Sequence, residues 1–82
     1  MLLLKPNCEC CDSDLPADAD ARICSFECTF CPDCAEHRLS GVCPNCGGKL
    51  EKRPTRVGAA LARFPASAER HVRAKPCPGA AA

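Results

Sequence analysis

Eight of the ten cysteines fall into four closely spaced pairs, and these residues carry most of the chemistry that the sequence offers. Two intervening residues let both sulfurs of a pair reach one metal ion, at about 2.3 Å, from a single tight turn. Four thiolates close a tetrahedral site, so eight thiols suffice for two such sites. The pairs are Cys8 with Cys11, Cys24 with Cys28, Cys31 with Cys34, and Cys43 with Cys46.

The compartment decides whether such thiols bind metal or form disulfides. The apolar stretch at residues 2–4 is far too short for a secretory signal peptide, and no apolar run approaches membrane-spanning length. We therefore expect a cytoplasmic protein with no membrane partner, in which thiols stay reduced. An even number of cysteines also allows a five-disulfide scaffold, but repeated C-x-x-C pairs in a cytoplasmic chain favour metal.

Zn²⁺ is the ion that we expect, at two per chain, because it accepts four thiolates in a tetrahedron without an electronic preference. Iron in a rubredoxin-like site is the alternative, since soft thiolates bind it as well. A site closed by four sulfurs leaves no position for water, and the sequence contains no P-loop pattern or other catalytic motif. We therefore expect no enzyme.

The composition changes near residue 53. Residues 1–52 hold nine cysteines and carry a formal charge of −4, whereas residues 53–82 carry +5 and are rich in alanine and proline. We expect a cysteine-rich zinc-binding module at residues 1–53 and a disordered tail at residues 54–82. The basic residues of the tail are sparse, so weak contact with nucleic acid or an acidic protein stays an alternative to a merely solvated segment.

The elements that must position the thiols are short. Residues 22–24 and 28–30 are typical of two strands joined by a tight hairpin, and residues 49–53 of a final strand. Residues 32–39 contain good helix formers and stop at Gly41, which predicts one short helix. Phe26 and Phe30 are expected to cover the metal sites. The fold class is therefore a small, zinc-stabilised α+β domain built on a β-hairpin, one short helix and zinc knuckles.

The segment CTFCPDCAE at residues 28–36, followed by CPNC at residues 43–46, resembles a RING finger, with Cys28 in place of the usual histidine. The resemblance implies a treble-clef-type cross-brace in which the two metal sites interleave along the chain. Spacing alone leaves a sequential arrangement open. The interleaved scheme assigns Cys8, Cys11, Cys31 and Cys34 to one zinc, and Cys24, Cys28, Cys43 and Cys46 to the other.

The chain as a whole resembles a bacterial family of short cysteine-rich proteins, domain of unknown function family 1272. The matching stretches are PNCE at 6–9, DLP at 14–16, ARICSFECTFC at 21–31 and GVCPNCGG at 41–48. That family carries no established activity. Ubiquitin-ligase function is not expected, because the positions that grip the partner enzyme in RING ligases hold Cys10 and Gly47, and the chain has no tryptophan.

Two functions are compatible with these observations. The first is a non-catalytic interaction module in which zinc holds a rigid surface for a protein partner. The alternative is zinc storage or thiol-based redox and metal sensing. Cys10 is interpreted as a spare thiol, with an alternative ligand or redox sensor as the other hypothesis, and Cys77 as an exposed tail thiol without a partner. His37 and His71 are interpreted as surface residues. The alternative for His37 is that it supports the zinc ligands without binding the ion itself.

Overall fold

The computed structural model describes residues 2–74 and 77. Three two-residue strands form its sheet: β1 at Arg22–Ile23, β2 at Thr29–Phe30 and β3 at Glu51–Lys52. The strand order is β2-β1-β3 and both pairings are antiparallel. The predicted hairpin and final strand are therefore present, with strands shorter than the sequence suggested. Because β1 lies in the centre, it joins the hairpin to the C-terminal end of the module.

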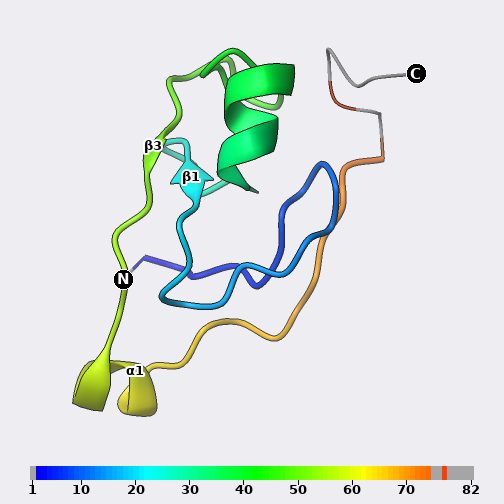
Figure 1. The fold of residues 1–82 in the computed structure, drawn as a ribbon. Coiled ribbons are helices and arrows are strands. Elements are labelled where there is room, and N and C mark those ends of the chain that lie inside the picture. The colour runs from blue at the N-terminus through cyan, green and yellow to red at the C-terminus, as the bar shows by residue number, and fades with distance from the viewer. Residues whose placement is uncertain (1, 75–76, 78–82) are drawn as a thin grey trace.

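The predicted helix is present in place but differs in type. It forms a π-helix, η1, at Cys34–Arg38, preceded by two α-helical residues at 32–33. The backbone N–H of Leu39 donates to the carbonyl of Cys34 at 3.0 Å, which is the i to i+5 bond of a π-helix. Ala35 and Leu39 turn inward from this segment and are buried. Figure 1 shows η1 as the green coiled ribbon.

The apolar core is small and is shared between aliphatic side chains and cysteine sulfurs. Phe30 is fully buried, as predicted, but Phe26 is 73% exposed, so the prediction that both phenylalanines cover the metal sites is wrong for Phe26. The reason is local: residues 24–28 form a tight turn, and a side chain at its tip faces solvent. The buried core residues include Leu15, Ala21, Phe30, Ala35, Leu39 and Leu50 together with Cys8, Cys24, Cys34 and Cys43.

Arg53, which directly follows β3, links the end of the cysteine-rich module to its N-terminal part. Its side chain is almost completely buried, and its guanidinium donates to the carbonyls of Lys5 at 2.9 Å, Leu15 at 3.3 Å and Pro16 at 2.9 Å. Burial lowers the pKa of this guanidinium. A planar fork of donors can serve several carbonyls at once, which explains an arginine at this position.

After Arg53 the chain forms a short helix, α1, at Gly58–Arg63, and then returns as an extended segment. Figure 1 shows this segment, yellow to orange, running back beside the blue N-terminal residues, and the backbone N–H of Ser67 donates to the carbonyl of Leu4 at 2.9 Å. The division of the chain at residue 53 stays a prediction. Within residues 2–74 and 77, neither helix has the length or the apolar character that crossing a bilayer requires.

Candidate metal centre

Four cysteines from two distant parts of the chain form the first cluster. The sulfurs of Cys8, Cys11, Cys31 and Cys34 all lie within 4.8 Å of one another. Cys8 and Cys11 belong to the first knuckle, whereas Cys31 follows β2 and Cys34 opens η1. Cys8 and Cys34 are buried and Cys11 is exposed, so the cluster lies at the edge of the core.

Glu9 and Thr29 hold the two halves of this cluster together. The backbone N–H of Glu9 donates to the carbonyl of Thr29 at 2.9 Å, and the backbone N–H of Thr29 donates to the Glu9 carboxylate at 2.6 Å. Both residues are buried, and Lys5 lies 3.3 Å from the same carboxylate. Because each residue is adjacent to or near a cysteine of the cluster, this double link sets the distance between the first knuckle and the end of β2.

The first and last knuckles share one backbone geometry. The N–H of the residue after the second cysteine, Asp12 or Gly47, donates to the carbonyl of the first cysteine at 2.9 Å in both cases. Asp12 and Gly47 both adopt the left-handed region, with φ of 61° and 78°. Glycine favours this region and aspartate tolerates it better than most residues. The sequence indicated the turn at Gly47 through its glycines, but Asp12 carried no comparable signal.

Backbone N–H groups point at the sulfurs of each knuckle. The N–H of Cys10 donates to Cys8 Sγ at 3.4 Å, that of Phe26 to Cys24 Sγ at 3.3 Å, and that of Gly48 to Cys46 Sγ at 3.4 Å. Hydrogen bonds of this kind favour the charged form of their acceptor. Each of these hydrogen bonds therefore offsets part of the negative charge that its sulfur carries when it binds a metal ion.

The second cluster contains Cys24, Cys28 and Cys43, whose sulfurs also lie within 4.8 Å of one another. Antiparallel pairing of β3 with β1 brings the last knuckle next to Cys24. Cys46 is exposed and is not part of this mutual set, although its thiol interacts with those of Cys24 and Cys43. The structure thus places three of the four predicted residues in contact distance and the fourth at the rim.

The thiols of the clusters differ in the direction in which their pKa values are shifted from the ordinary value of a cysteine. Burial and the neighbouring thiols raise the pKa of Cys34, and burial raises that of Cys43 to about 12. Burial opposes the shift at Cys11, but hydrogen bonds with Ser13 and nearby thiols lower its pKa to about 7. Crowded thiols resist becoming thiolates together unless a cation offsets their charge.

These donors fit a thiophilic metal ion. A tetrahedron with metal–sulfur distances of about 2.3 Å has sulfur–sulfur edges of about 3.8 Å. The two clusters are compact enough to close on an ion with small movements. Each contains buried sulfurs, with Cys11 exposed in the first cluster and Cys46 exposed at the rim of the second. The protein therefore has two cysteine clusters that could hold metal ions. That all eight paired cysteines are ligands stays a prediction.

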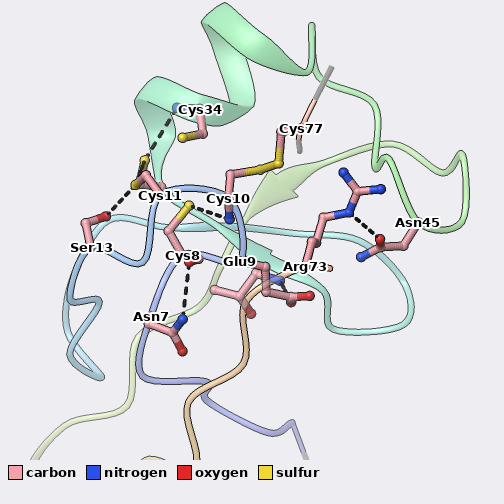
Figure 2. The surroundings of a disulfide bond; sticks show 12 residues. Asn7, Cys8, Glu9, Cys10, Cys11, Ser13, Cys34, Asn45, Arg73 and Cys77 are labelled. Carbon is pink, nitrogen blue, oxygen red and sulfur yellow. Dashed lines mark hydrogen bonds between the residues drawn. A yellow bond between two sulfur atoms is a disulfide. The ribbon is translucent and has the colours of Figure 1, made fainter. Parts of the chain in front are cut away.

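Cys10 and Cys77 form a disulfide, which corrects the interpretation of both as unpaired thiols. Cys77 is buried, not exposed, because its sulfur packs against the first knuckle (Figure 2). The two residues are separated by 67 positions. One indication was available: Cys10 and Cys77 are the two cysteines that remain when the four close pairs are removed. Long-range pairing of this kind cannot be read from spacing.

Neither histidine joins a cysteine cluster among residues 2–74 and 77. His37 is exposed, and its Nε2 lies 3.6 Å from Asp33 Oδ1. His71 pairs through its backbone with the side chain of Asn7. Three polar residues near the clusters were not predicted from the sequence. Asn7 and Glu9 are buried beside Cys8, and the side chain of Asn45 hydrogen-bonds to Cys28. Their place directly beside a predicted ligand was the available clue.

Comparison with known proteins supports one assignment. A family model described as "Protein of unknown function (DUF1272)" matches residues 1–56. The chain is 58% identical over 78 residues to "Uncharacterized protein R02474" of Rhizobium meliloti (strain 1021), covering 94% of this chain and 93% of that protein. No solved structure matches the chain significantly. The chain therefore belongs to the DUF1272 family.

Proposed function

We propose that the protein is a non-catalytic interaction module held together by two structural zinc ions. The observation that carries this proposal is the first cluster, in which four sulfurs from two separate segments lie within 4.8 Å of one another. A domain with so small an apolar core needs such a cross-link, and the free energy of metal binding becomes free energy of folding.

The proposed fold is a RING-like, treble-clef-type cross-brace. Its support is the interleaved grouping of the sulfurs: Cys11 and Cys31 belong to the first cluster, while Cys24 and Cys28, which lie between them in the chain, belong to the second. A cross-brace makes each ion hold two separated segments, which locks the module into one arrangement. Cys46 completes the second site when an ion is present, since its thiol already interacts with two members of that cluster.

Elemental analysis of reduced protein tests the metal directly. We expect two zinc ions per chain in protein purified without added metal. A red product that contains iron would show that the bound metal is iron and not zinc. Removing the metal with a chelator under reducing conditions should abolish the far-UV circular dichroism of the folded module. A compact species that carries no ion in native mass spectrometry contradicts the proposal.

A closed tetrathiolate site supplies no open coordination position, so the proposed role is binding and not catalysis. The partner is a protein, and the acidic charge of the module argues against strong binding of nucleic acid. Eight free cysteines that serve as ligands require a reducing compartment, which supports the cytoplasm as location.

Zinc storage or redox sensing is the second candidate, and the exposure of Cys11 and Cys46 favours it. An exposed thiolate ligand is open to a competing chelator or to oxidation. The rate of zinc transfer to a weak chromogenic chelator at neutral pH separates the two candidates. A structural module should retain both ions, whereas a storage or sensing protein should release at least one quickly, or upon mild peroxide.

A further inference from the structure

Residues 67–73 lie along residues 4–9 in an extended, strand-like arrangement. The N–H of Ser67 donates to the carbonyl of Leu4 at 2.9 Å, and the N–H of Arg73 donates to the carbonyl of Glu9 at 2.9 Å. Between them, Asn7 pairs with His71. The two segments run in the same direction, and the contact resembles the addition of an extended peptide to an open backbone edge.

Asn7 recognises backbone and not side chain. Its Nδ2 donates to the carbonyl of His71 at 2.9 Å, and its Oδ1 accepts from the N–H of His71 at 3.3 Å. The Asn7 side chain is buried, and its Nδ2 also donates to Asp12 Oδ1 at 2.9 Å, which fixes the orientation of the amide. Any residue in the same extended conformation offers the same two groups, so this part of the contact does not depend on the docked sequence.

Two arginines of the docked segment are recognised by their side chains. The Arg70 guanidinium lies 2.9 Å from Asp12 Oδ1 and 2.8 Å from Asp14 Oδ1, and it donates to the Asp12 carbonyl at 2.7 Å. Arg73 Nε donates to Asn45 Oδ1 at 2.8 Å (Figure 2). The docked segment therefore carries two arginines, three positions apart, whose side chains are both bound by polar groups of the module.

A covalent bond closes this contact. The Cys10–Cys77 disulfide joins the first knuckle to a residue four positions beyond Arg73. Figure 2 shows the disulfide beside the same edge that carries Asn7 and Glu9. The docked segment is thus held at its far end by a bond that thiol–disulfide exchange can open.

We propose that the edge formed by residues 4–14 together with Asn45 is a docking site for an extended Arg-x-x-Arg segment of a partner protein. The chain's own residues 67–73 fill this site while the Cys10–Cys77 disulfide is closed, and reduction makes the site available. This inference rests on the proposed function as an interaction module. Opening consumes two equivalents of a thiol such as glutathione: the disulfide gives two protein thiols, and the two reductant molecules give one disulfide.

Opening the disulfide makes exchange of the docked segment possible. Ion pairs between side chains as exposed as Arg70, Asp12 and Asp14 contribute little individually. A segment that stays attached by its linker competes at an effective concentration on the order of millimolar. A partner segment with the same two arginines and further contacts of its own can therefore replace it, whereas it cannot compete with a segment closed by a disulfide.

Limited trypsin digestion tests the redox part, because Arg70 and Arg73 are themselves cleavage sites. Zinc-loaded full-length protein is compared in its disulfide form and as Cys77→Ser. We expect cleavage after Arg70 and Arg73 about tenfold faster in Cys77→Ser, since proteolysis follows the population of the open form. Cleavage after Arg63, which lies in α1 over the Phe64 ring, should not change. Equal rates after Arg70 in both proteins overturn the closure by the disulfide.

Peptide binding tests the docking site. The probe is a fluorescent peptide with the sequence of residues 66–74, ASAERHVRA, and the receptor is full-length Cys77→Ser that also carries Arg70→Ala to weaken its own segment. We expect saturable binding, weaker by about fivefold for an Arg70→Ala version of the peptide, as for loss of an exposed bidentate ion pair. The matched receptor with Arg63→Ala in place of Arg70→Ala should bind less, because its own segment still competes. The disulfide form should not bind.

Zinc content is measured on the same receptor samples. Two zinc per chain without peptide binding overturns the docking site and leaves the proposed zinc module standing. Binding that depends on Arg70 of the peptide and on the open disulfide supports the docking site, even if the metal content contradicts the two-zinc proposal. Equal binding of both peptide versions overturns the recognition of arginine.

Discussion

The Sγ atoms of Cys11 and Cys31 lie 3.8 Å apart, although the two residues are twenty positions apart in the chain. This distance equals the edge of a tetrahedron of sulfurs around zinc, about 3.8 Å. Four cysteines lie nearer to Cys11 in the sequence than Cys31 does: Cys8, Cys10, Cys24 and Cys28. The fold thus brings the first knuckle to the end of β2 and not to the start of the hairpin.

This relationship predicts how zinc is lost in paired variants. Cys11→Ser with Cys31→Ser removes two ligands from one proposed site, so the protein should retain one zinc. Cys11→Ser with Cys24→Ser removes one ligand from each site, and at a chelator concentration that strips three-thiolate sites it should retain none. Elemental analysis after such treatment gives both counts. In a sequential arrangement the two results would be exchanged.

Cys46 is expected to complete the second site in spite of its exposure. Cys46→Ser should lower the zinc content from two to one under the same chelator, because three thiolates hold the ion less tightly than four. Native mass spectrometry gives the count. Cys77→Ser provides the control, since Cys77 belongs to neither cluster and both ions should remain. Two ions retained in Cys46→Ser would show that the second site has another fourth ligand.

Arg53 is expected to be the most sensitive charged residue of the module. Arg53→Lys leaves carbonyls of Lys5, Leu15 and Pro16 without donors, because an ammonium group cannot serve them in the same geometry. The free energy of unfolding should fall by about 2 kcal/mol, as measured by urea unfolding at a fixed concentration of free zinc.

Lys52→Ala is the matched control for Arg53, because Lys52 is the exposed neighbour in β3. Its free energy of unfolding should change by less than about 0.5 kcal/mol. An Arg53→Lys protein as stable as Lys52→Ala would mean that the three carbonyls find other donors, such as water.

Gly47 should tolerate asparagine better than valine. Its φ of 78° lies in the left-handed region, and a Cβ at this position would meet no other atom within 4 Å, so the cost of substitution is a backbone cost. Asparagine adopts this region far more readily than a β-branched residue. Gly47→Val should lower the free energy of unfolding by about 1 to 2 kcal/mol relative to Gly47→Asn. If Gly47→Val and Gly47→Asn were equally stable in urea, the left-handed backbone that Gly47 shares with Asp12 would not be what limits substitution at this position.

Local features of this protein were open to prediction from sequence. The hairpin, the helix position and the final strand all follow from short-range signals: residue preferences, turn residues and the reach of two sulfurs from one turn. The type of η1 did not follow, since the i to i+5 bond between Cys34 and Leu39 depends on how both ends of the segment are held. The exposure of Phe26 was missed because the prediction rested on its apolar side chain. A residue at the tip of a tight turn faces solvent whatever its side chain.

The sequence by itself determined which residues can bind a metal and where the chain turns, because both depend on neighbours two to four positions away. The tertiary structure decided which thiols meet. The link between Glu9 and Thr29 joins the first knuckle to β2, and the pairing of β3 with β1 carries Cys43 to Cys24. The tertiary structure also brings Cys10 to Cys77, through backbone contacts along residues 67–73. Contacts between distant residues depend on the packing of whole segments, and spacing along the chain carries no record of it.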